Sequence, residues 1–106
     1  MKRITWLQFI RRLKREFPVD RAVIVQSTNT LPLDKRFDPP YSRWMGETIQ
    51  YPTHYKVRIN NEYTKDEMVE TLIHEWAHLL SWGKDEDDHG DNWGIALALL
   101  YRTILG

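Results

Sequence analysis

The sequence contains no cysteine among its 106 residues. This absence excludes disulfides, iron–sulfur clusters, thiolate zinc sites and thiol catalysis, so any metal must be bound by histidine, aspartate or glutamate. No apolar run approaches the roughly 18 to 20 residues that a membrane span requires. The apolar start of the chain is interrupted by Gln8, Arg11 and Arg12, too early for a signal peptide. We therefore expect a cytoplasmic protein with no membrane partner.

Net charge is also absent, because 15 basic side chains balance 15 acidic ones. The charges are nevertheless separated along the chain, with 12 basic and 5 acidic residues in 1–58 and 3 basic and 10 acidic residues in 59–106. This separation predicts one basic and one acidic surface. The basic N-terminal half is a candidate surface for DNA, and a solvated helix face is the alternative for its arginines. The length fits a single domain over residues 1–106.

Helix caps and apolar spacing predict three helices. A capping box formed by Thr5 and Gln8 starts the first, and Pro18 ends it. A second capping box at 64–67 starts a long helix over about 65–82, with Gly83 as its stop. The third helix is expected over about 88–105. It is apolar on nearly all sides, so we expect it to be well buried.

Three strands are expected at 22–26, 43–50 and 55–59, and the proline-containing segment 29–41 is expected to be an irregular loop. In the third strand Tyr55, Val57 and Ile59 alternate with basic residues, which is typical of a sheet with one buried face. The predicted fold class is therefore α+β, with a small antiparallel sheet of about three strands packed against the helices.

The segment His74-Glu75-Trp76-Ala77-His78 falls within the second expected helix. Histidines four residues apart share one helix face, about 5 to 6 Å between Cβ atoms. Both imidazoles can therefore reach one ion at Zn–N distances of about 2.0–2.1 Å. Both lie outside the apolar stripe of the helix, which favours a metal site over core histidines. Glu75 follows the first histidine and can accept a proton from metal-bound water without coordinating the metal.

A zinc site of this kind needs a third protein ligand. His89 follows His78 by eleven residues, and a turn at Gly83 allows the third helix to fold back over the two histidines. We therefore expect His89 to be the third ligand. The six-residue spacing of metzincins does not occur. A carboxylate ligand is the alternative, and its candidates are Asp87, Asp88 and Asp91.

His74-Glu75-x-x-His78 followed by His89-Gly90-x-x-Trp93 resembles the SprT-like metalloproteases, which include the Spartan DNA–protein crosslink proteases. The similarity is specific over about 55–93 and looser from residue 20 to the end. It implies a minimal zincin fold, a Zn²⁺ cofactor on His74, His78 and His89, Glu75 as general base, and hydrolysis of peptide bonds in DNA-associated proteins. The chain lacks the cysteine-ligated zinc module and the basic tail of larger relatives. Its visible basic substitutes are the first helix and Lys35, Arg36, Arg43, Lys56 and Arg58.

The sequence thus predicts a zinc metalloendopeptidase whose protein or peptide substrate lies extended beside a sheet edge. Two alternatives belong to other classes. One is a catalytically silent zinc-binding adaptor for nucleic acid or protein. The other is a small metal-free helical adaptor in which the histidines are incidental.

Overall fold

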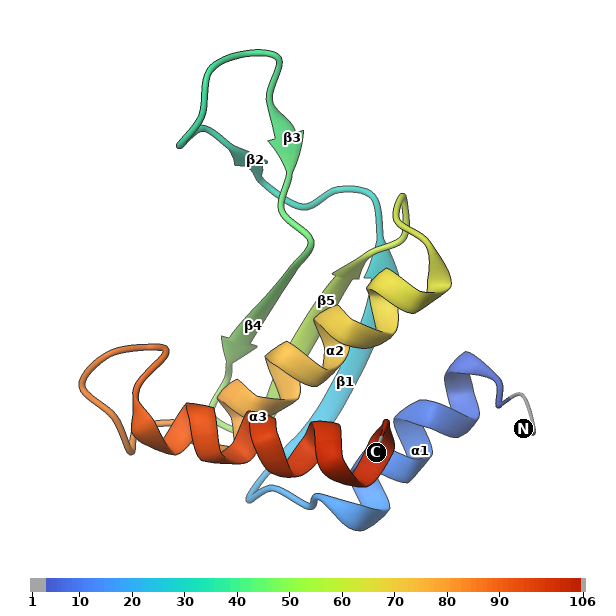
Figure 1. Ribbon diagram of the computed structural model, residues 1–106, viewed down its shortest axis with the longest axis vertical. Coiled ribbons are helices and arrows are strands. Elements are labelled where there is room, and N and C mark those ends of the chain that lie inside the picture. The colour runs from blue at the N-terminus through green and yellow to red at the C-terminus, as the bar shows by residue number, and fades with distance from the viewer. Residues whose placement is uncertain (1–3, 106) are drawn as a thin grey trace.

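The computed structural model describes residues 4–105. Residues 1–3 and 106 lie outside the described residues. The prediction of a single domain includes all four, and the predicted basic half includes residues 1–3. The α+β class is confirmed (Figure 1). The helices are α1 (Trp6–Glu16), α2 (Lys65–Leu80) and α3 (Asp91–Ile104). The strands are β1 (Ala22–Thr28), β2 (Leu33–Asp34), β3 (Ser42–Arg43), β4 (Gly46–Gln50) and β5 (His54–Asn60).

Helices α1 and α2 begin where their caps predict, whereas α3 begins at Asp91, three residues after the expected start. Thr5 and Thr64 each accept a hydrogen bond from the backbone of the third helical residue, whose side chain bonds back, so both capping boxes are present. Helix α2 ends at Leu80, slightly before the expected position. Gly83 then adopts a φ of 74°, a left-handed conformation that suits glycine and allows the chain to reverse toward α3.

The main sheet has the order β1-β5-β4 and is mixed. β4 and β5 form an antiparallel hairpin, whereas β1 pairs with β5 in parallel, with Val25 opposite Val57. The prediction of a purely antiparallel sheet is therefore wrong for β1. The physical reason is that β5 lies between the other two strands. The chain reverses between β1 and β4 and again between β4 and β5, so β5 runs in the direction of β1.

Residues 29–45 form an arm that projects away from the main sheet (Figure 1). Part of the expected irregular loop is ordered as β2, which pairs with β3 in a separate two-stranded sheet. The strand predicted over 43–50 is accordingly divided, and β4 begins only at Gly46. Leu31 is fully buried at the base of the arm, and its carbonyl accepts a hydrogen bond from Arg43 Nη1 at 2.6 Å.

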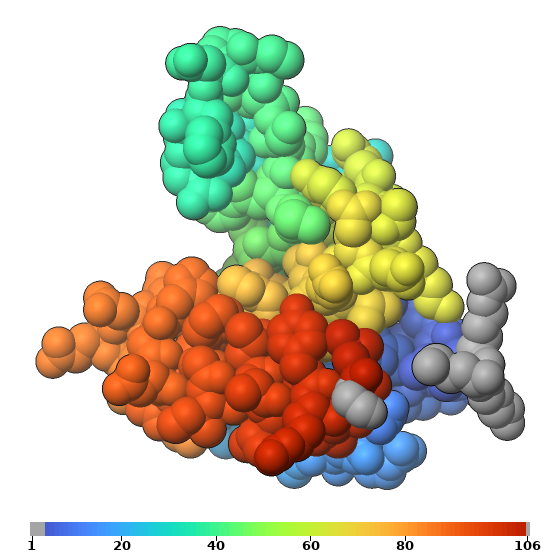
Figure 2. All heavy atoms as spheres, in the orientation of Figure 1, coloured from blue at the N-terminus to red at the C-terminus, as the bar shows by residue number. Residues whose placement is uncertain are grey.

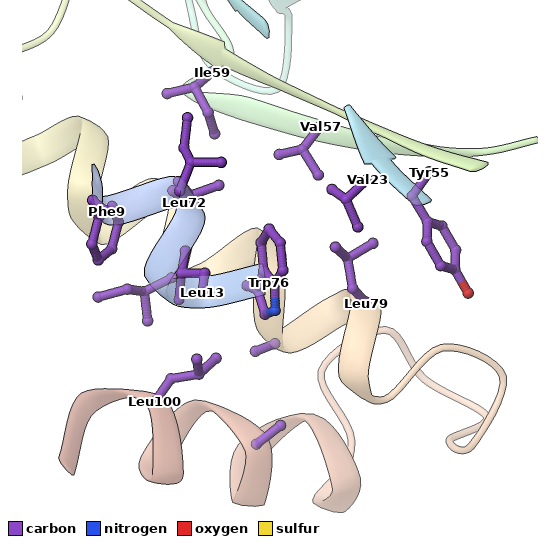
Figure 3. Packing of buried hydrophobic residues seen from close by; sticks show 14 residues of the cluster. Phe9, Leu13, Val23, Tyr55, Val57, Ile59, Leu72, Trp76, Leu79 and Leu100 are labelled. Atoms are coloured by element: carbon purple, nitrogen blue, oxygen red, sulfur yellow. The ribbon is translucent and has the colours of Figure 1, made fainter. Parts of the chain in front are cut away.

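The core lies between one face of the main sheet and the helices (Figure 3). Trp76 and Leu72 of α2 occupy its centre, packed between Leu13 of α1 and Val57 of β5. The Trp76 indole Nε1 donates to the Phe17 carbonyl at 3.0 Å, so its polar atom is satisfied where α1 ends. Helix α2 is therefore fixed along the face opposite to its histidines.

Helix α3 crosses α2 and is buried along one side only (Figure 1). Ala96 and Leu100 are buried, but Ile95 is 62% exposed and Leu99 is 47% exposed. The expectation of a well-buried third helix is therefore wrong for its outer side. A helix with apolar residues on every side can be buried on every side. Its sequence does not show whether another element packs against each side. No helix within residues 4–105 is long and apolar enough to cross a membrane.

Candidate metal centre

Two of the three predicted ligands lie on successive turns of α2. His74 and His78 are half-buried, and their Nε2 atoms are 3.2 Å apart. Their rings meet nearly edge to face, with centroids 4.9 Å apart. The helical spacing of four residues thus directs both imidazole nitrogens toward one point, as the sequence predicts.

The third predicted ligand, His89, lies in the loop between α2 and α3. Its Nε2 is 3.4 Å from His74 Nε2. Nitrogens bound to one tetrahedral zinc ion at about 2.0–2.1 Å lie about 3.3 to 3.4 Å from each other. Both separations from His74 therefore agree with the edges of a tetrahedral site.

Within residues 4–105, this trio is the one group of three or more histidines and carboxylates whose ligand atoms come close enough for a metal ion. All three ligand atoms lie within 4.8 Å of one another. The carboxylates of Asp87, Asp88 and Asp91, the alternative third ligands, are not part of this group. The structure therefore brings together three histidines that can bind a metal ion.

The surroundings of His74 and His78 favour neutral imidazoles, the form that binds metals. Burial lowers the pKa of His74, and the nearby His89 lowers it further. For His78, burial and the two neighbouring imidazoles lower the pKa to about 4, although Asp88 acts in the opposite direction. Both rings are thus ready to bind a cation at neutral pH without first losing a proton.

Glu75 is buried where α2 meets β4, separate from the three imidazoles. It is 7% exposed, and Thr48 Oγ1 donates a hydrogen bond to its Oε2 at 2.8 Å. Burial raises the pKa of Glu75, and the hydrogen bond from Thr48 opposes that rise. Gly46 allows β4 to lie close to α2. A Cβ at this position would lie 2.7 Å from Thr71 Cγ2 and 3.4 Å from Glu75 Cγ.

Trp93 packs against all three histidines from the first turn of α3. Its ring centroid lies 5.1, 5.6 and 4.6 Å from those of His74, His78 and His89. Its indole Nε1 donates to the His74 carbonyl at 3.4 Å. Trp93 therefore ties α3 to α2 at the histidines, and it excludes water from one side of the group.

Figure 2 shows the surface hollowed between the arm and the segment 83–95, with part of α2 at the bottom of the hollow. A neighbouring open pocket of about 290 Å³ is lined by His78, by the turn after α2 and by three aspartates, namely Asp85, Asp87 and Asp88. The candidate metal centre is therefore open to solvent. His54, the fourth histidine, lies at the start of β5, stacked on Tyr51, and is not part of the centre.

The basic residues that the sequence suggests for DNA are spread over α1, the arm and β5. Several of them bind acidic side chains of this chain: Arg12 pairs with Glu16, Arg36 with Asp34, and Arg58 with Glu47. Arg43 donates to the backbone carbonyl of Leu31. The predicted basic surface is thus partly neutralised by internal ion pairs.

Two residues near the centre, Thr48 and Asp85, make hydrogen bonds that the sequence did not predict. Thr48 is separated from Glu75 by 27 positions, and no local pattern indicates that a strand threonine will meet a helix carboxylate. Asp85 is the first of four consecutive acidic residues at 85–88, and its carboxylate accepts hydrogen bonds from the start of α3. The one available indication was its position a few residues before His89-Gly90.

Comparison of the chain with protein-family models, with curated proteins and with solved structures found no match.

Proposed function

We propose that this chain is a zinc-dependent endopeptidase in which His74, His78 and His89 bind the metal. The observation that carries the proposal is the combination of three converging Nε2 atoms with a buried carboxylate, Glu75, which follows His74 in the same helix and is held by Thr48. A site for structural zinc needs four protein ligands, whereas a catalytic site keeps one position open. Three imidazoles beside an open pocket agree with the open type.

The roles of the side chains follow from their positions. Bound zinc would lower the pKa of a water ligand to about 7 and polarise a substrate carbonyl. Glu75 accepts the proton of the attacking water on its carboxylate and delivers it to the leaving amine. Thr48 holds Oε2 of Glu75, so the orientation of the carboxylate does not depend on its flexible side chain alone. Burial raises the pKa of Glu75, which makes it a stronger base than a free carboxylate.

The free edge of β4 supports a peptide as the substrate. β4 pairs with β5 on one side and is the last strand of the main sheet on the other. An extended polypeptide can therefore add to this edge through main-chain hydrogen bonds, with little dependence on its sequence. Thr48, whose hydroxyl contacts Glu75, lies on this strand, so a peptide bound there passes beside the general base.

DNA-associated proteins are the substrate class that the resemblance to SprT-like proteases suggests. The support from this chain is the basic half and the exposed position of Lys35 on the arm. Binding through these residues would weaken steeply with added salt, because phosphate contacts release counterions. Salt-dependent binding of a labelled oligonucleotide, compared between wild type and Lys35→Ala, is the direct measurement.

The proposal is tested by Glu75→Gln beside Glu70→Gln, an exposed control on the same helix. Glu75→Gln is expected to keep stoichiometric zinc and to lower hydrolysis of a labelled unfolded polypeptide by about 10²–10⁴-fold, the usual contribution of a general base. Glu70→Gln should behave as wild type. His78→Ala should lose both zinc and hydrolysis.

The alternatives give different results in the same experiment. A catalytically silent zinc adaptor predicts bound zinc with no difference in cleavage between wild type and Glu75→Gln. A metal-free adaptor predicts no bound zinc and no change of melting temperature with a chelator. An active Glu75→Gln enzyme would rule out Glu75 as the base.

A further inference from the structure

His89 occupies a position that its own segment does not explain. His74 and His78 belong to a packed helix, but residues 84–90 have no helix or strand, and the His89 side chain is exposed. An exposed loop side chain normally samples several rotamers. His89 Nε2 nevertheless lies 3.4 Å from His74 Nε2, so contacts elsewhere must fix the backbone that carries it.

The Asp85 carboxylate supplies such contacts. Its Oδ1 accepts hydrogen bonds from the Asn92 backbone N at 3.1 Å and from Asn92 Nδ2 at 2.8 Å. Its Oδ2 accepts from the Trp93 backbone N at 3.0 Å. These are donors at the start of α3, where Gly90 is the N-cap and has no side chain to bond them. Asp85 therefore caps α3 from five residues upstream of the N-cap and closes the loop that contains His89.

The closure is tight at the residue that follows His89. A Cβ on Gly90 would lie 2.7 Å from both Cβ and Cγ of Asp85, a separation that real side chains do not tolerate. The Gly90 backbone N also donates to the Asp87 carbonyl at 3.2 Å. Asp85 and Gly90 are thus in direct contact across the base of the loop, and the His89 backbone has little freedom to move away from α2.

The cap also determines where Trp93 lies. Asp85 binds the backbone of Trp93, and the Trp93 ring lies 4.6 Å from the His89 ring, nearly perpendicular to it. The carboxylate remains charged at neutral pH, because its hydrogen bond from Asn92 lowers its pKa. A negative group at a helix N-terminus is further stabilised by the helix dipole.

We propose that Asp85 is a positioning residue for the third metal ligand: its carboxylate joins the loop 85–90 to the start of α3 and so places His89 beside His74 and His78 before a metal binds. This inference rests on the proposed zinc site. It goes beyond that proposal because Asp85 is not itself a ligand and acts only through the backbone that it holds.

The experiment compares Asp85→Ala with Asp87→Ala, a matched control that removes the same charge from the same loop and the same pocket lining. Zinc affinity is measured by competition with a chromophoric chelator, and the visible absorption of the Co²⁺-substituted protein reports the ligand geometry. Asp85→Ala should bind zinc about 10- to 100-fold more weakly than wild type, the usual cost of losing a group that orients a ligand. Its Co²⁺ bands should shift, whereas Asp87→Ala should match wild type in both measurements.

Asp85→Asn separates a loss of folding from a loss of His89 positioning. Its amide oxygen can still accept hydrogen bonds from Asn92, but the Trp93 backbone N loses its acceptor. It should lie between wild type and Asp85→Ala in zinc affinity, and it decides the matter if Asp85→Ala does not fold. Equal zinc affinity in wild type, Asp85→Asn and Asp87→Ala would overturn the positioning role and leave the zinc site intact. Absence of zinc binding in wild type would overturn the proposed function itself.

Discussion

His74 and His78 project from a helix whose other face is built into the core, whereas His89 projects from a loop on the surface. The first region owes its geometry to apolar packing around Trp76 and Leu72. The second owes it to a few polar contacts, chiefly those of the Asp85 carboxylate. The two regions should therefore respond differently to mutation and to metal removal. Packing around α2 fixes two of the histidines, and the Asp85 hydrogen bonds place the third before a metal binds. Because these bonds are few and mostly exposed, the loop should be the less stable region and should gain more from a bound metal.

The largest effect is expected from Trp76→Ala in the core region, compared with the same change at Trp82. Trp76 is fully buried, so its removal should lower the free energy of unfolding by about 3–5 kcal/mol. Trp82 is 38% exposed in the turn after α2 and contacts Tyr55 at a ring distance of 5.6 Å. Its loss should cost about 0.5–1.5 kcal/mol. Urea unfolding in the presence of a chelator measures both without a contribution from zinc, and equal costs would contradict the division into two regions.

Zinc removal should have the next largest effect. A ligand at 100 times its Kd stabilises the folded state by about 2.7 kcal/mol, which corresponds to about 10 to 20 °C in melting temperature for a domain of this size. Hydrogen exchange should show where this stability resides. Amides of 84–93 should lose protection in the chelated protein, while those in the middle of α2 keep theirs. A uniform loss over both segments would show that the core region also depends on the metal.

The smallest effect is expected at Thr48, which links Glu75, the proposed general base, to β4. Thr48→Val keeps the shape of the side chain but removes the hydrogen bond to Glu75 Oε2, which contributes about 1 kcal/mol. Because the carboxylate then loses its fixed orientation, kcat should fall by about fivefold with little change in KM or zinc affinity. Thr48→Ser restores the hydroxyl and should recover most of the activity. An unchanged kcat in Thr48→Val would show that packing alone orients Glu75.

Local patterns predicted the parts of the molecule that local interactions determine. The capping boxes at Thr5 and Thr64 fix the starts of α1 and α2, and the spacing of His74 and His78 fixes their shared face. His89 was predictable because Gly83 and Gly90 indicate a sharp return of the chain. The parallel pairing of β1 with β5 was not predictable in this way. It depends on which strand of the β4–β5 hairpin lies next to β1, and no local pattern determines that choice.

The remaining differences have the same origin in long-range contacts. Ile95 and Leu99 of α3 are exposed because no element among the described residues packs against that side of the helix. The contact of Thr48 with Glu75 depends on the relative position of a strand and a helix that are far apart in the sequence. The ordering of the arm into β2 and β3 depends on the burial of Leu31 at its base.

The glycine at position 46 has a consequence for the spacing between β4 and α2. Since a Cβ at this position would lie 2.7 Å from Thr71 Cγ2, a larger residue there would require β4 or the Thr71 side chain to move. The sheet edge proposed to bind the peptide and the helix that carries the base are therefore spaced by one residue without a side chain. The separation between this sheet edge and the Glu75 carboxylate therefore depends on the smallest amino acid in the chain.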